Sequence, residues 1–172
     1  FAFWTLMQGL TAALAVVFTG GDLFTLYVAL ELLTFAAVPL VCLDGRAETL
    51  EAALRYLLFA LLGSILYLLG VGLVYGRYGV LDIVLLAERT RVADDSQRAM
   101  LVAGALMTAG LAAKTALFPL HLWLPPAHAN APAPASAVLS ALVVKGSFFL
   151  TVRLWFDVMP TLANAAAMTV LG

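Results

Sequence analysis

The sequence predicts an all-α fold, a polytopic bundle of transmembrane helices, and three observations lead to it. Of the 172 residues, 64% are apolar and only 11% are charged, whereas a soluble domain carries roughly a quarter charged residues. The mean hydropathy is +1.05, and a globule of this size cannot hide so much apolar surface from water. The apolar runs are long and continuous, as in membrane helices, instead of alternating as in barrel strands. These observations exclude a soluble enzyme.

Charge and cysteine content exclude further classes. Nine Lys and Arg face ten Asp and Glu, which leaves no basic face for nucleic acid. The single cysteine, Cys42, rules out a disulfide framework, a four-thiolate metal site and an iron–sulfur cluster within the chain. We therefore expect no metal, no cofactor and no redox chemistry in this chain. The sequence begins with an apolar run at Phe1 and ends at Gly172 within another apolar run. We therefore expect it to be a fragment of a longer membrane protein.

Five apolar runs approach or exceed the roughly 20 residues that a spanning helix needs, and turn residues separate them. The longer connection at residues 76–98 mixes an apolar patch with charges. It is either a short interfacial helix with a polar loop or an ordinary connection with an apolar anchor. The predicted spans are residues 1–19, 22–43, 52–75, 99–125 and 134–159, and residues 161–172 are taken as the start of another.

Three of these spans carry an ionisable residue near their middle. Glu31 lies in the second span, Lys114 in the fourth and Lys145 in the fifth, and these two are the only lysines of the chain. A charged side chain at the membrane centre costs roughly 2.5–3.5 kcal/mol on insertion scales. We therefore expect all three to face inward, toward one another or toward water.

The charges admit two interpretations. One Glu and one Lys could form a static ion pair that only holds helices together. A second lysine without a second acid at mid-span fits that interpretation less well, and a desolvated lysine releases its proton more readily than arginine does. Glu31, Lys114 and Lys145 therefore favour a proton path. Arg55, near the start of its span, is expected to extend toward the interface.

The backbone next to Lys114 is predicted to be irregular. Pro119 removes a helix hydrogen bond and crowds the carbonyl of Thr115. The result is either a plain proline kink or a broken helix, which is tolerated at membrane depth where it faces protein or a water-filled cavity. His121, two helical turns from Lys114, is a candidate proton relay because His titrates near neutral pH. No third ligand accompanies His121 and His128, so a zinc site is not expected.

The segment from Lys114 to Lys145 resembles the signature of the antiporter-like proton-channel subunits. These subunits occur in respiratory complex I, in Mrp-type multisubunit cation/proton antiporters and in membrane-bound hydrogenases. The matching stretch reads KTALFPLHLWLPPAHANAPAPASAVLSALVVK. Gly21-Asp22-Leu23-Phe24 with the following Glu31, and Ala53-Leu54-Arg55-Tyr56 with Gly63-Ser64, resemble the family as well.

The resemblance implies that the chain corresponds to helices four to eight, one of two inverted half-channels. Glu31 would then be the fifth-helix glutamate, Lys114 the lysine of the broken seventh helix, and Lys145 the eighth-helix lysine. Arg55 stands where many relatives have lysine and is at most a helper. The resemblance also places the loop 76–98 on the outer side, against the simple count of Lys and Arg.

The implied function is proton translocation, or cation/proton antiport, by a membrane subunit of a multisubunit complex. Its expected partners are other membrane subunits, the lipid bilayer and protons, with sodium as an open alternative. Its expected location is the bacterial inner (plasma) membrane, and at most it is a pumping subunit of a translocase such as NADH:quinone oxidoreductase. The competing interpretation is a non-conducting structural subunit. A membrane enzyme acting on a lipid or quinone lacks a catalytic constellation here.

Overall fold

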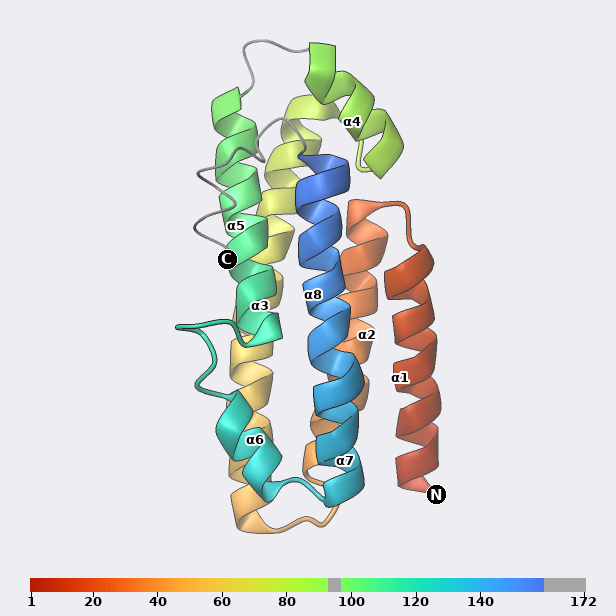
Figure 1. Cartoon of the computed structure of the whole chain (residues 1–172), viewed down its shortest axis with the longest axis vertical. Coiled ribbons are helices and arrows are strands. Elements are labelled where there is room, and N and C mark those ends of the chain that lie inside the picture. Colours follow the sequence, from red (N-terminus) through yellow and green to blue (C-terminus); the bar gives the residue numbers. More distant parts are fainter. Residues whose placement is uncertain (93–96, 160–172) are drawn as a thin grey trace.

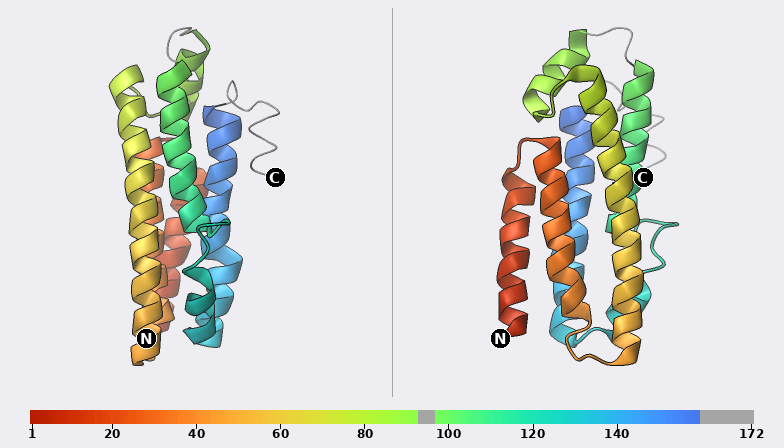
Figure 2. Two further views of the ribbon diagram at one scale, coloured as in Figure 1. Left: turned by 90° about the vertical axis from the view of Figure 1, so that its left-hand side faces the viewer. Right: turned by 180° about the vertical axis from the view of Figure 1, so that it is seen from behind.

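The computed structural model describes residues 1–92 and 97–159. Within them the chain forms a bundle of helices that run along one long axis (Figure 1): α1 (Ala2–Thr19), α2 (Leu23–Val41), α3 (Ala47–Tyr78), α5 (Gln97–Thr115) and a continuous final helix. That helix comprises α7 (Ala133–Val138), α8 (Val144–Arg153) and the π-helical segments η1 (Leu139–Val143) and η2 (Leu154–Val158). Seen from behind, α1, α2 and α3 stand side by side (Figure 2).

Four helices of the described residues are long and apolar enough to cross a membrane: α1, α2, α3 and the run Ala133–Val158. Their lengths range from 18 to 32 residues, against the approximately 20 that a span requires. This confirms the predicted all-helical membrane fold. The predicted run 99–125 differs, because α5 ends at Thr115 and the chain resumes a helix only at α6 (Leu124–Asn130). The expected further span at residues 161–172 lies outside the described residues.

At one end of the bundle, the N-terminus of α2 is joined to the N-terminus of a short helix in the connection between α3 and α5. The connection 76–98 contains α4 (Ile83–Val92), which lies across this end (Figure 1). Asp22 caps α2 by accepting the amides of Phe24 and Thr25, both at 2.9 Å, and Asp82 caps α4 in the same way. The amide of Leu23 donates to Leu81 O at 3.0 Å and the amide of Ile83 to Gly21 O at 2.9 Å. The two helix starts are thereby joined through their backbones.

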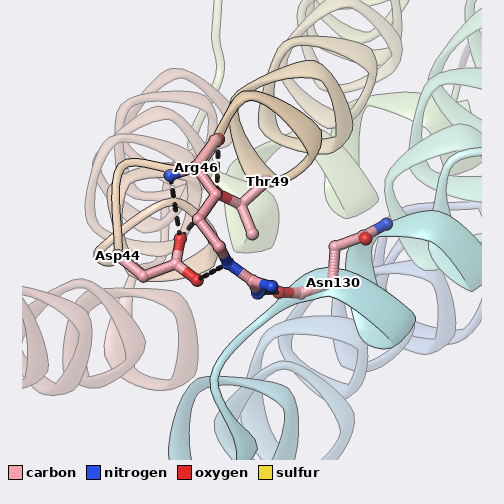
Figure 3. Close-up of polar contacts among 4 residues, drawn as sticks. All are labelled: Asp44, Arg46, Thr49 and Asn130. Carbon is pink, nitrogen blue, oxygen red and sulfur yellow. Dashed lines mark hydrogen bonds and ion pairs between the residues drawn. The ribbon is translucent and has the colours of Figure 1, made fainter.

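A polar cluster in the α2–α3 loop fastens the opposite end (Figure 3). Asp44 accepts a hydrogen bond from Thr49 Oγ1 at 2.6 Å and forms an ion pair with Arg46. Arg46 Nη2 also donates to Asn130 O, the final carbonyl of α6, at 3.3 Å. The Thr49 hydroxyl, with help from Arg46, holds the pKa of the Asp44 carboxyl below its usual range. An arginine at a helix C-terminus satisfies an otherwise unpaired carbonyl, so the loop is tied to α6.

Glycines bring α3 and α5 into backbone contact. A Cβ atom added to Gly63 would lie 2.6 Å from Gly110 O and 3.1 Å from Lys114 Cγ. Small residues allow such close approach in membranes, where packing and not the hydrophobic effect joins helices. The contact places α5 directly against α3 (Figure 2), and Lys114 Cγ lies at this contact.

Candidate functional site

The structure brings Glu31 and Lys114 together in the interior of the bundle. Glu31 projects from α2 and Lys114 from the last turn of α5, and Lys114 Nζ lies 3.2 Å from Glu31 Oε1. The lysine side chain is 5% exposed and the glutamate side chain 15%. Such a pair persists away from water only when further hydrogen bonds satisfy its remaining atoms.

Two hydroxyl groups supply these hydrogen bonds. Lys114 Nζ donates to Thr34 Oγ1 at 3.0 Å, and Ser64 Oγ on α3 donates to Glu31 Oε1. Both residues are buried. Glu31 and Thr34 are three residues apart and therefore share one face of α2. Thr34 is not among the site residues predicted from the sequence; its i,i+3 spacing from Glu31 is the signal that could have identified it.

The helix break predicted near Lys114 is confirmed, but its cause differs from the one expected. Ala116 has φ +56°; the amide of Leu117 donates to Ala112 O at 3.0 Å and that of Ala116 to Ala113 O at 3.3 Å. This pattern is a Schellman ending, in which a left-handed residue stops the helix. Pro119 therefore lies beyond the end of α5, in the link to α6, and does not kink a continuing helix.

Trp123 completes the ending of α5. Its indole Nε1 donates to Ala113 O at 2.9 Å, and its side chain is 1% exposed. The ring stacks on Tyr56 of α3, with centroids 4.3 Å apart and planes at 10°. A buried indole N–H normally finds an acceptor, and here the acceptor is the carbonyl that precedes Lys114.

A small cavity adjoins Lys114 on the side of α8. Its lining includes Thr34, Tyr56, Lys114 and Ser147, and the volume open to the centre of a water-sized sphere is about 10 Å³. That volume is close to the room that one water molecule needs. Beside it, Thr115 Oγ1 donates to Ser147 Oγ at 3.0 Å. Polar groups thus continue from the end of α5 to α8.

The remaining predicted site residues lie apart from the pair. Lys145 on α8 is exposed and has no ion-pair partner among residues 1–92 and 97–159, so within them the structure does not bring it together with Glu31 and Lys114. His121, in the link after α5, is partly buried, and its Nδ1 has no hydrogen-bond partner within the described chain. Arg55 faces outward and pairs with Glu51 at 2.6 Å. In the described ranges no group of three potential metal ligands occurs.

A buried acid–lysine pair at a helix break, within a bundle of membrane-type helices, defines a class of integral membrane proteins with ionisable groups in the membrane interior. The chain belongs to the NADH:quinone oxidoreductase/Mrp antiporter transmembrane family, whose model matches residues 20–171. The resemblance seen in the sequence is thereby confirmed.

Individual relatives come from several kinds of complex. NADH-quinone oxidoreductase subunit N of Desulforudis audaxviator is 39% identical over 159 residues, which are 88% of this chain and 31% of that protein. The archaeal membrane-bound sulfane sulfur reductase contains a chain with TM-score 0.86 and 30% identity, covering 96% of this chain and 34% of that one. The Mrp complex from Dietzia sp. DQ12-45-1b contains a chain with TM-score 0.85 and 28% identity, and the match covers 96% of this chain and 31% of that one. This chain therefore spans about a third of the length of these relatives.

Proposed function

We propose that the chain is part of a membrane subunit that translocates protons, or exchanges a cation for protons, within a multisubunit complex of the plasma membrane. The observation that supports the proposal best is the Glu31–Lys114 pair, buried at the end of α5 and 3.2 Å apart. Membership in the NADH:quinone oxidoreductase/Mrp antiporter family supports it independently. The partners would be neighbouring membrane subunits and the remainder of the longer subunit.

The pair has the chemistry of a proton site. While Glu31 is close, its carboxylate stabilises the ammonium form of Lys114. When a signal from a neighbouring subunit draws Glu31 away, that stabilisation is lost, and the desolvated lysine gives up its proton. Lysine suits this role because it exchanges its proton when buried, whereas arginine stays charged.

The onward route would run toward α8. The water-sized cavity lies beside Lys114 and reaches Ser147, and the Thr115–Ser147 hydrogen bond continues in the same direction. Lys145 follows on α8 with its side chain turned outward. We assign Lys145 the transfer of protons out of this part of the subunit, and His121 a relay role near the break. Arg55, paired with Glu51, is a helper at most.

The structural alternative predicts different behaviour. A buried ion pair can often be replaced by apolar residues of similar volume without loss of stability. If the pair only holds the helices together, a substitution that preserves its charge and its contact should leave translocation unchanged. Lys114→Arg preserves the positive charge beside Glu31 but cannot release a proton at neutral pH, so it separates the two functions.

The experiment measures proton translocation by the parent complex in everted vesicles. Wild type is compared with Lys114→Ala and Lys114→Arg at matched assembly, and each is driven first by an electron donor and then by a sodium gradient. We expect both variants to lose translocation. Normal pumping by Lys114→Arg would show that only the charge matters, and normal pumping by Lys114→Ala would remove Lys114 from the path. The effective driving force distinguishes a redox-driven subunit from an antiporter.

A further inference from the structure

The carbonyl of Ala113, at the end of α5, accepts two hydrogen bonds, one from the Ala116 amide at 3.3 Å and one from the indole of Trp123. In an uninterrupted α-helix, the carbonyl of Ala113 would accept the amide of Leu117, four residues on. That amide instead donates to Ala112 O at 3.0 Å, and the indole of Trp123 donates to Ala113 O at 2.9 Å. The indole therefore supplies the shorter of the two hydrogen bonds on the carbonyl directly before Lys114.

The indole is held rigidly from both directions. Its ring is buried against Tyr56 of α3, at 4.3 Å between centroids, and Tyr56 lines the cavity beside Lys114. Trp123 also precedes the first residue of α6, whose last carbonyl is bound by Arg46 at 3.3 Å. The donor is thus fixed with respect to α3 and α6 and not only to its own loop.

We propose that Trp123 is a positioning residue for Lys114. Its N–H fixes the last turn of α5, and so holds the ammonium group against Glu31 and Thr34. Without this donor the Ala113 carbonyl keeps only the 3.3 Å hydrogen bond from the Ala116 amide, and the last turn of α5, which carries Lys114, is held less firmly. The expected effect of Trp123 on proton transport rests on the proposed function of Lys114.

A second tryptophan provides a matched control. Trp155 on η2 also buries its indole Nε1, but that atom has no hydrogen-bond partner in the part of the chain that the structure describes. Removing its N–H therefore breaks no hydrogen bond there. Trp155→Phe and Trp123→Phe make the same chemical change in the same protein, and only the second one removes a donor from a helix end.

The test isolates the N–H by placing two tryptophan analogues at position 123 of the full-length subunit in its complex. Benzothienylalanine keeps the shape of the ring but has sulfur in place of N–H, whereas 5-fluorotryptophan keeps the N–H. Amide hydrogen exchange of residues 112–117 and proton translocation are measured together. Loss of one buried hydrogen bond should speed exchange there about tenfold. We expect faster exchange and reduced translocation with benzothienylalanine and Trp123→Phe, and recovery of both with 5-fluorotryptophan.

Wild-type exchange and translocation with benzothienylalanine would overturn the proposal, as would equal effects of Trp155→Phe. The exchange measurement does not depend on transport. If Lys114→Arg pumps normally, the proposed function fails, yet exchange at residues 112–117 still decides whether Trp123 positions the end of α5.

Discussion

Gly63 is the position at which a single methyl group should disturb the site most directly. Alanine there places its Cβ 2.6 Å from Gly110 O and 3.1 Å from Lys114 Cγ. Carbon–oxygen contacts between helices are normally about 3.3 Å or longer, so α3 and α5 must separate by roughly 0.7 Å. Such overpacking costs about 1–3 kcal/mol. We expect Gly63→Ala to be less stable by about that amount than the same change at an open position of α3, and to reduce translocation because Lys114 is displaced with α5.

Gly72 on the same helix is the matched control, since a Cβ there meets nothing within 4 Å. Replacing a helical glycine with alanine at an open position stabilises by about 0.5–1 kcal/mol. The assay is the unfolding midpoint of the purified complex, followed by translocation in vesicles for each variant. Equal stability of Gly63→Ala and Gly72→Ala would refute the account of a backbone contact at Gly63.

Three further predictions concern stability and pH. Glu31→Gln should destabilise the folded subunit by about 3–5 kcal/mol because it leaves the buried Lys114 cation unpaired. Adding Lys114→Met should restore most of that stability, measured by thermal unfolding, but should not restore proton transport, measured in vesicles. Ala116→Gly should stabilise by about 1 kcal/mol, because alanine is strained at φ +56°, and an unchanged unfolding midpoint would contradict this. Since the folded pKa of Asp44 lies below the usual range of a carboxyl group, its stabilising contribution is complete above the pKa of the unfolded chain and is lost as the pH falls through the folded pKa. Thr49→Val should raise the carboxyl pKa of Asp44, and NMR titration would measure the change.

Most of the helical architecture followed from simple patterns. Long apolar runs between turn residues predict α1 to α3 because a spanning helix must satisfy all its backbone groups internally. Glu31 and Lys114 could be identified from their positions near the middle of the predicted spans, since a charge in the membrane interior needs a partner of opposite charge. The break was predicted from Pro119 but arises earlier, at Ala116. Alanine gives no signal of a left-handed conformation, because glycine is the usual residue there.

Other parts of the site depend on contacts between distant residues and could not be predicted. The direction of Lys145 depends on how α8 is rotated in the bundle, and hydropathy does not determine that rotation. The Trp123–Tyr56 stack joins residues of two separate helical segments, and no sequence pattern indicates which aromatic rings will meet. Ser64 was noted as part of a family motif, but its bond to Glu31 requires the register between α2 and α3.

The hydrogen bond from Trp123 to Ala113 has a consequence for biosynthesis. Donor and acceptor are ten residues apart, so Lys114 emerges from the ribosome before the group that completes its helix end. Tyr56 on α3 is synthesised earlier still, because chains are made from the N-terminus. The stacking surface is therefore in place first, the lysine follows, and its position becomes fixed only when Trp123 docks. Newly made chains that stop between Lys114 and Trp123 should hold the lysine in a helix without its final ending.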